Sequence, residues 1–211
     1  MSIVGTVAVQ CRGCGTSHDA RLVQSINARK DPEAKQRLVA GELNVVACSC
    51  GMRTQLAATL LFHDPDADYY CQVCPGGEDA MAEAEVAFRA AGATGVQRLV
   101  PSQNALVEKI KLLDAGLEDW AIEMTKVLLL ASIEPLDLDR VLLFDRVDRE
   151  AEVIHWLLFP IGSLEPQRVA SPLGAYQRIA ERPRSRPAAD ALRIDRAWAV
   201  TAVREMIADG N

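Results

Sequence analysis

Residues 10–15 of the chain read QCRGCG, and residues 47–53 read ACSCGMR. The two cysteines of the first stretch are separated by two residues, those of the second by one, and a glycine follows each pair. Glycine lets the backbone turn with its N–H groups near the sulfur atoms. Two such turns can together supply the four thiolates that a tetrahedral structural zinc ion requires. The sequence therefore predicts a zinc site whose ligands are Cys11, Cys14, Cys48 and Cys50.

The spacing of the cysteines leaves two alternatives open. Residues 15–47, which lie between the pairs, are more than the ~15–20 residues of a compact zinc ribbon and fit a helix inserted between the two turns. A mixed site could use Cys71 or Cys74, or the first four cysteines could be reduced thiols without a metal. The stretch CQVC at 71–74 is followed by Pro-Gly-Gly and not by the helix that a thioredoxin-like redox pair requires. We therefore predict that Cys71 and Cys74 are buried or half-buried residues without redox function.

Composition and charge restrict the class of protein. The chain has 211 residues and a formal net charge of -6, which disfavours non-specific binding to nucleic acid and to anionic membranes. No signal-peptide pattern is present, and no apolar run approaches the ~20 residues that span a bilayer. We expect a cytoplasmic protein without a membrane partner. Under reducing conditions its six cysteines would act as metal ligands or redox groups and not as disulfides.

The first half of the chain is predicted to combine strands with one helix. Asp31 and Pro32 are typical of an N-cap and a first helical residue, and Gly41 is a helix stop. The acidic stretch HDPDAD at 63–68 lacks the glycine and the final glutamate of an EF-hand loop, so we interpret it as a turn. The predicted strands are residues 3–10, 18–23, 53–62 and 69–74.

The second half is predicted to contain helices and a hairpin. Ser102 is a candidate cap for the second of three helices, which are residues 78–92, 103–115 and 117–133. Two apolar runs around DRVDREAE predict a β-hairpin over 140–159. A final helix at 190–208 follows the basic linker RPRSRP. This helix either packs on its own domain or docks in the groove of a partner.

Three stretches of the sequence together resemble a known family. They are CRGCG at 11–15, QSINARKDPEAKQRLVAGELNVVACSCG at 24–51 and LLFHDPDADYY at 60–70. They resemble the CpXC domain family of bacteria and archaea, and the resemblance covers roughly residues 7–130. It implies a zinc-ribbon-like site built from two Cys-Pro-x-Cys motifs.

The chain departs from this family pattern in both motifs. Arg12 occupies the position of the first proline. In the second motif, either Ala47 stands at the first cysteine position with Cys48 in place of the proline, or one residue is missing. The two alignments differ in whether Cys48 is a family ligand, and the sequence leaves both open.

The predicted fold class is α+β. A zinc-ribbon-like antiparallel β unit with an inserted helix is followed by helices, a β-hairpin and a C-terminal helix. We expect a CpXC-like domain with its helical continuation at 1–132 and a C-terminal β-hairpin and helix region at 133–211. The chain contains no G-x-S-x-G, Walker A or G-x-G-x-x-G motif, so we predict no catalytic or cofactor-binding residues.

These observations favour a non-enzymatic, regulatory protein–protein interaction module with a structural zinc ion. The resemblance extends to a CpXC-type regulator of cell polarity that acts on a small Ras-like GTPase through its activating protein, and it implies a similar regulatory complex as partner. A thiol redox or metal-dependent enzyme built on the cysteine pairs is the first alternative. A nucleic-acid-binding zinc ribbon is the second, which the acidic charge disfavours.

Overall fold

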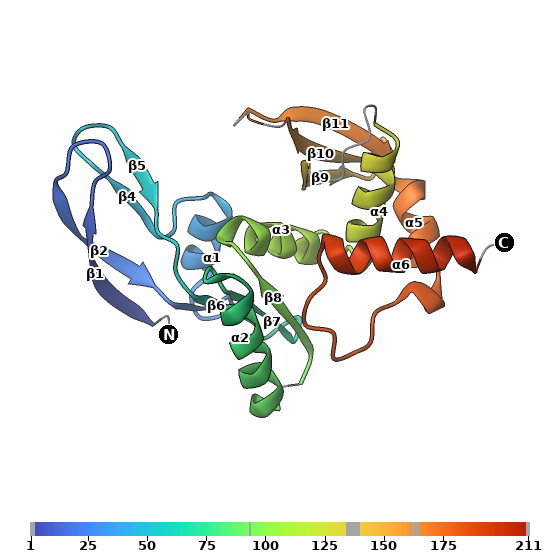
Figure 1. Ribbon diagram of the computed structural model, residues 1–211, viewed down its shortest axis with the longest axis horizontal. Helices are drawn as coiled ribbons and strands as arrows, with labels where there is room; N and C mark the ends of the chain where they lie inside the picture. Colours follow the sequence, from blue (N-terminus) through green and yellow to red (C-terminus); the bar gives the residue numbers. More distant parts are fainter. Residues whose placement is uncertain (1–2, 93, 134–139, 161, 163–164, 210–211) are drawn as a thin grey trace. The chain divides into compact units, whose positions relative to one another are not determined.

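The computed structural model describes residues 3–92, 94–133, 140–160, 162 and 165–209 (Figure 1). Helices and strands follow one another in mixed order, which confirms the predicted α+β fold. The chain divides into two compact units, Met1–Val107 (unit 1) and Glu108–Asn211 (unit 2). The division by compactness falls inside a helix, Gln103–Asp114, whereas the predicted domains at 1–132 and 133–211 follow the extent of the family resemblance. The predicted boundary stays a prediction.

The described residues of unit 1 form three sheets. The ribbons β1–β2 and β4–β5 are antiparallel, and the third sheet has the order β3-β6-β7-β8 (Figure 1). The strands are β1 Val4–Gln10, β2 Ser17–Val23, β3 Ser25–Asn27, β4 Val45–Ala47, β5 Arg53–Gln55, β6 Leu60–Asp64, β7 Tyr69–Val73 and β8 Val96–Val100. The helices are α1 Pro32–Val39 and α2 Gly77–Ala91.

Helix α1 lies between the two ribbons in sequence, as predicted. A side-chain oxygen of Asp31 accepts a hydrogen bond from the Ala34 N–H at 3.1 Å, and Pro32 is the first helical residue. Buried Ala34 and Leu38 lie on the inner face of the helix. Gly41 follows the helix with a φ of 70°, the left-handed conformation that a glycine stop supplies.

The predicted strand over 53–62 is wrong in one respect, because it is two strands. β5 ends at Gln55, and the next residue, Leu56, donates its N–H to the Asn44 carbonyl at 2.8 Å. Residues 56–59 then carry the chain from the ribbon to the third sheet, where β6 begins at Leu60. The break separates the cysteine-bearing ribbons from the sheet that follows.

The third sheet contains two strands that the sequence did not predict. β3 pairs in parallel with β6, and β8 pairs in parallel with β7 after the α2 crossover. β8 is buried at three successive residues, Arg98 to Val100, so it lacks the alternation on which strand prediction depends. Its pairing with β7 joins residues far apart in the sequence, which a local hairpin pattern cannot predict.

Unit 2 joins an antiparallel sheet, in the order β11-β10-β9, to helices. The predicted hairpin is confirmed, and β11 adds a third strand that was not predicted. Trp156 and Phe144 lie in the apolar core, with ring centroids 6.2 Å apart in an edge-to-face contact. The elements after α3 (Gln103–Asp114) are α4 Asp119–Ala131, β9 Val141–Asp148, β10 Val153–Phe159, β11 Gln167–Pro172, α5 Leu173–Ala180, a short 3-10 turn Pro183–Ser185 and α6 Arg196–Ala208.

The C-terminal helix begins later than predicted. α6 starts at Arg196, because Asp195 caps it by accepting a hydrogen bond from the Trp198 N–H at 3.0 Å. Ala199 and Val203 are buried in the core of unit 2, and α6 packs against α4. Of the two alternatives for this helix, the structure shows packing within unit 2.

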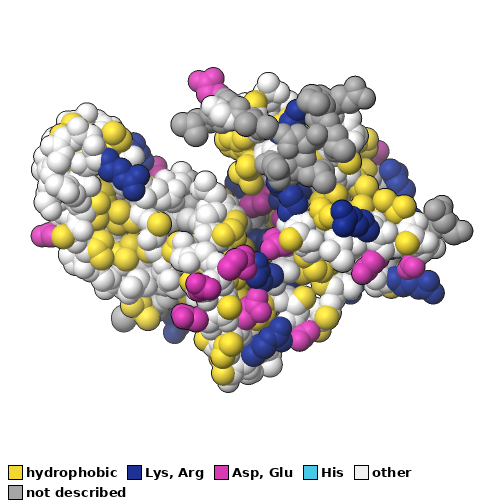
Figure 2. Space-filling view, viewed as in Figure 1, with side chains coloured by type: hydrophobic (Ala, Val, Ile, Leu, Met, Phe, Trp, Pro, Cys, Tyr) yellow, Lys and Arg dark blue, Asp and Glu magenta, His cyan; other side chains and the backbone are white. Residues whose placement is uncertain are grey.

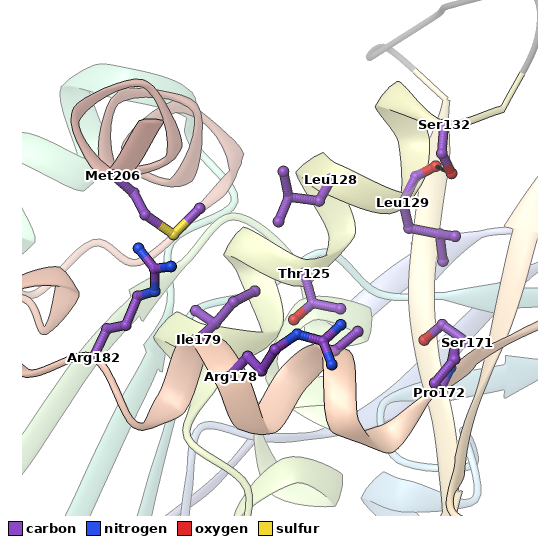
Figure 3. A pocket seen from close by; sticks show the side chains of 11 residues that line it. Thr125, Leu128, Leu129, Ser132, Ser171, Pro172, Arg178, Ile179, Arg182 and Met206 are labelled. Atoms are coloured by element: carbon purple, nitrogen blue, oxygen red, sulfur yellow. Dashed lines mark hydrogen bonds between the residues drawn. The ribbon is translucent and has the colours of Figure 1, made fainter. Parts of the chain in front are cut away.

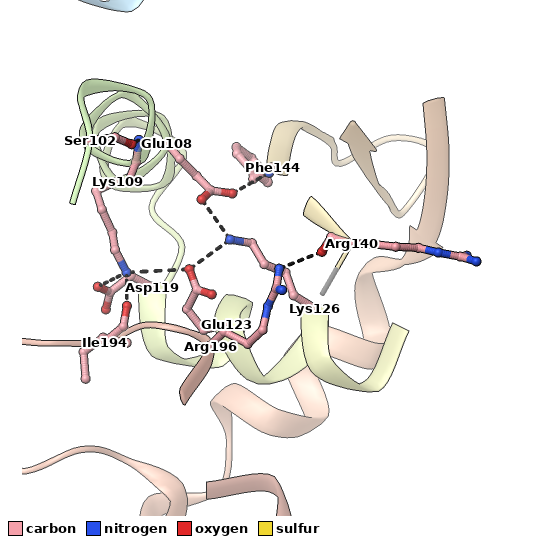
Figure 4. Close-up of polar contacts among 11 residues, drawn as sticks. Ser102, Glu108, Lys109, Asp119, Glu123, Lys126, Arg140, Phe144, Ile194 and Arg196 are labelled. Atoms are coloured by element: carbon pink, nitrogen blue, oxygen red, sulfur yellow. Dashed lines mark hydrogen bonds and ion pairs between the residues drawn. The ribbon is translucent and has the colours of Figure 1, made fainter. Parts of the chain in front are cut away.

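Four charged residues of α3 and α4 are buried inside unit 2: Glu108, Lys109, Glu123 and Lys126 (Figure 4). Lys126 Nζ is 2.8 Å from a carboxylate oxygen of Glu108 and 2.9 Å from one of Glu123. Burial by itself would lower the pKa of Lys126, but the charges of Glu108 and Glu123 outweigh it and raise the pKa. Glu108 also accepts a hydrogen bond from the backbone N–H of Phe144 in β9. The charges thereby tie two helices to the sheet.

Candidate metal centre

The first cysteine pair lies at the tip of the β1–β2 ribbon. The Cys11 N–H donates to the Thr16 carbonyl at 2.8 Å, which closes the loop, and the Gly15 N–H donates to the Cys11 carbonyl at 2.8 Å. Gly15 has a φ of 75°, a conformation that a residue with a Cβ rarely adopts. The glycine after the pair is therefore required for the turn.

The second pair lies at the tip of the β4–β5 ribbon in a similar loop. The Cys48 N–H donates to the Met52 carbonyl at 2.9 Å, and the Gly51 N–H donates to the Cys48 carbonyl at 2.9 Å. Gly51 has a φ of 89°. Both loops thus turn on a left-handed glycine that directly follows the second cysteine.

A comparison of the two loops decides between the alignments that the sequence left open. Ala47 pairs with Arg53 at the end of the β4–β5 ladder, just as Gln10 pairs with Ser17 at the end of β1–β2. The first cysteine of each pair is the next residue in the chain. Cys48 is therefore the structural equivalent of Cys11, and the second loop is one residue shorter between its cysteines.

The four sulfur atoms form one cluster. Cys11 Sγ is 3.6 Å from Cys50 Sγ, and Cys14 Sγ is 3.5 Å from Cys48 Sγ. All four lie within 4.8 Å of one another. Metal–sulfur bonds of ~2.3 Å in a tetrahedron place the sulfurs about 3.8 Å apart, so the cluster has the dimensions that such an ion requires. The first cysteine of each pair is buried and the second is exposed.

Contacts between the ribbons hold the two loops together. A Cβ at Gly13 would lie 3.1 Å from the terminal methyl of Met52 and 3.5 Å from Cys50 Sγ, so the first loop passes close to the second. Farther down, the Asn44 side chain accepts a hydrogen bond from the Val23 N–H at 2.8 Å and donates to the Val23 carbonyl at 2.9 Å. Asn44 thus continues β2 as a strand backbone would, and it fixes the start of the second ribbon beside the first.

Asn44 is a residue that the sequence analysis did not single out. It has a φ of 56°, which asparagine tolerates better than most residues, and it is buried. Its place in the dipeptide Leu43-Asn44, directly before the second ribbon, is the only signal in the sequence. An asparagine is not distinctive enough by itself to predict this role.

The pKa values of the thiols differ within the cluster. Backbone N–H groups of Cys14 and Gly13 lower the pKa of Cys11, and the hydroxyl and N–H of Thr16 lower the pKa of Cys14 to about 6. The N–H of Met52 lowers the pKa of Cys50, but the three neighbouring sulfurs outweigh it and raise the pKa to about 11. Four adjacent thiolates repel one another, so full ionisation requires a cation among them.

The other two cysteines lie outside the cluster. Cys71 is inside β7, opposite Phe62, and is fully buried. Cys74 follows the end of β7, its sulfur accepts from the Gln72 side-chain amide at 3.7 Å, and burial raises its pKa. The prediction that both are buried or half-buried is confirmed, since both are buried, and the group of four close ligand atoms contains neither.

The two glycine-turned loops form a zinc-ribbon-like unit, and their four clustered sulfurs could hold a metal ion. A model of the CpXC protein family matches residues 9–126, and the chain belongs to this family. Neither a curated protein nor a solved structure matches the chain. Among the residues that the structure describes, no helix is long and apolar enough to cross a membrane.

Proposed function

We propose that the chain is a non-enzymatic protein–protein interaction module whose two ribbons are held together by a structural zinc ion. The observation that carries the proposal is the cluster of four sulfurs, which come from the tips of two ribbons and lie within 4.8 Å of one another. Structural zinc sites use four protein ligands, whereas catalytic sites keep one position open for water or substrate. Cys11, Cys14, Cys48 and Cys50 would fill all four positions, and the ion would then supply folding free energy and not chemistry.

Elemental analysis tests the metal. Protein purified without chelators should contain about one zinc per chain, because one set of four thiolates binds one ion. Substitution by Co²⁺ should give the charge-transfer absorption of a tetrahedral four-thiolate site. Well under half an equivalent of zinc, together with no cobalt spectrum after reconstitution, would overturn the structural-zinc proposal.

The partner is proposed from the family resemblance. A regulatory complex that contains a small GTPase and its activating protein, with a role in cell polarity, is the most specific form of the proposal. The full chain should co-purify with a GTPase-activating protein from its native cell, and Cys14→Ser should abolish this association because it unfolds the ribbons. Arg12→Ser, at an exposed position of the same loop, is the matched control. Co-purification that is unchanged in Cys14→Ser would show that the ribbons are not needed for the partner.

The six free thiols support a cytoplasmic location within the same proposal, because a reducing compartment keeps them available to a metal. A thiol enzyme is the second candidate function, and the low pKa of exposed Cys14 is the observation in its favour. The two candidates differ in the zinc-loaded protein, where a structural site leaves no reactive thiolate at Cys14. Rapid alkylation of Cys14 in zinc-loaded protein would favour the thiol enzyme.

A further inference from the structure

Unit 2 contains a cavity that neither the metal centre nor the family resemblance explains. It lies between α4, α5 and α6 and has a volume of about 380 Å³ (Figure 3). Ligand pockets in proteins are typically about 300–1,000 Å³, mostly apolar, and have a few polar groups that orient the ligand. The apolar residues that line this cavity are Leu128, Leu129, Pro172, Ala175, Ile179 and Met206.

The floor of the cavity offers few polar groups to a ligand. Thr125 donates its hydroxyl to the Ala121 carbonyl at 2.7 Å, and Ser171 Oγ accepts from the Trp156 indole at 2.9 Å. Both hydroxyls are buried and already have partners within the protein. An apolar group can therefore fill the floor without leaving a buried polar atom unpaired.

One side of the cavity opens to solvent with an apolar surface. Trp120, Met124 and Leu128 follow one another at intervals of four residues on α4. Trp120 and Met124 are buried, but Leu128 is 37% exposed at the cavity. Figure 2 shows hydrophobic side chains around a basic side chain where α4 and α6 lie. Exposed apolar surface beside a cavity is typical of a binding site.

Two arginines give the cavity a positive charge. Arg178 lies in the last turn of α5, Arg182 follows that helix, and both side chains line the cavity (Figure 3). Neither guanidinium has an ion pair or a side-chain hydrogen bond with any residue in the described part of the chain. Arg186, which is also exposed, pairs with Glu118. The chain as a whole is acidic, so two unpaired cations beside an apolar cavity are complementary to an anion.

We propose that this cavity binds a small amphiphile with one carboxylate and an unbranched apolar chain of medium length, such as a medium-chain fatty acid. The apolar chain would occupy the cavity among Leu128, Ile179 and Met206. The carboxylate would lie at its mouth and accept hydrogen bonds from Arg178 and Arg182, because guanidinium groups match carboxylate geometry. This site is independent of the proposed zinc centre and adds a small-molecule ligand to the proposed interaction function.

Calorimetric titration of the full chain with decanoate, below its micelle concentration, tests the proposal. Decanoate should bind with a Kd of about 1 mM or tighter. Decanol and decyltrimethylammonium, which have the same apolar chain without the negative charge, should bind at least about tenfold more weakly, since a charge-assisted hydrogen bond contributes about a factor of ten. No measurable decanoate binding would overturn the proposal, and equal binding of decanol would overturn the role of the arginines.

Variants locate the binding site. Arg178→Ala with Arg182→Ala should weaken decanoate binding by at least about tenfold. The matched control is Arg168→Ala with Arg204→Ala, which removes the same charge from residues that do not line the cavity, and it should change the Kd by less than about twofold. Ala175→Leu should block the cavity and abolish binding. Each variant is used only if its far-UV circular dichroism and its thermal midpoint match those of the parent. Equal weakening in both double variants would overturn the proposed site.

Discussion

Cys14 and Cys48 are 34 positions apart in the chain, and their sulfur atoms are 3.5 Å apart. They belong to different ribbons, and no disulfide links them. Two thiols at this distance lose conformational freedom and gain little from a weak S–H hydrogen bond. A metal ion that binds both would compensate for this cost, so the close approach supports a metal between the ribbons.

Substitution of single cysteines separates the metal site from ordinary buried thiols. Cys14→Ser removes one of the four candidate ligands and should abolish stoichiometric zinc binding and lower the thermal midpoint strongly, because metal-binding free energy is folding free energy. Cys71 lies outside the cluster, so the Cys71→Ser protein should still bind zinc. Zinc content and thermal midpoint are measured on both proteins. Similar zinc contents in the two variants would contradict a site at Cys14.

The Asn44 side chain is expected to position the second ribbon. Asn44→Ala leaves the Val23 N–H and carbonyl without their partners, which should lower the free energy of unfolding by about 2 kcal/mol. Zinc affinity should fall as well, since the two loops would no longer be held in register. Denaturant titration and competition with a zinc chelator measure the two effects.

Asn104→Ala is the control for Asn44→Ala, because Asn104 is exposed and lies outside the ribbons. Its free energy of unfolding should change by less than about 0.5 kcal/mol. If Asn44→Ala were equally mild, the paired hydrogen bonds would not determine how the ribbons meet.

The thiol pKa values predict how the metal-free protein reacts with iodoacetamide. A thiolate reacts and a thiol does not, so the alkylation rate of Cys14 should rise with pH to half its maximum near pH 6 and stay constant above pH 7. Cys50, whose pKa is raised to about 11, should react slowly at neutral pH. Peptide mass spectrometry after timed quenching gives the rate at each cysteine.

Zinc should protect Cys14 from this reagent, because a metal-bound thiolate is a weaker nucleophile and is held within the cluster. Cys74 serves as an internal reference, since burial raises its pKa and should keep it slow with or without zinc. Alkylation of Cys74 before Cys14 in the metal-free protein would contradict the predicted order of reactivity of the two thiols.

The buried charges of unit 2 should be necessary for its stability. Lys126→Met leaves the buried carboxylate of Glu108 without its cation and leaves Glu123 with only the longer 3.8 Å contact to Lys109, which should cost about 3–5 kcal/mol. The raised pKa of Lys126 means that its stabilising charge is complete below the pKa of an unfolded lysine, about 10.4, and is lost only as the pH rises through the higher folded value. The destabilisation should therefore be undiminished between pH 7 and pH 9.

Lys111→Met is the control for Lys126→Met. Lys111 lies on the same helix as Glu108 but is only partly buried, so its free energy of unfolding should change by less than about 0.5 kcal/mol. Denaturant titration at both pH values measures the two variants. Equal effects of the two substitutions would show that the buried network does not stabilise unit 2.

Local patterns in the sequence were sufficient for several features. Three features depend on neighbouring residues, whose conformational preferences can be inferred from their residue types. They are the helix cap at Asp31, the β9–β10 hairpin and the two glycine turns. The predicted helices at 78–92 and 103–115 match α2 and α3 for the same reason. The spacing of the cysteines also identified the four residues whose sulfurs lie together.

Tertiary structure alone decided the features that depend on distant segments. Three such features bring together residues far apart in the sequence. They are the parallel pairing of β8 with β7, the hydrogen bonds between Asn44 and Val23, and the buried ion pair of Glu108 and Lys126. A charged residue on a helix has the same local pattern whether it faces solvent or a neighbouring helix. The sequence by itself indicated that Cys11, Cys14, Cys48 and Cys50 could share a metal, but it left a mixed site with Cys71 or Cys74 open. Only the folded chain decided how the two ribbons meet, because that depends on hydrogen bonds and burial between segments without local periodicity.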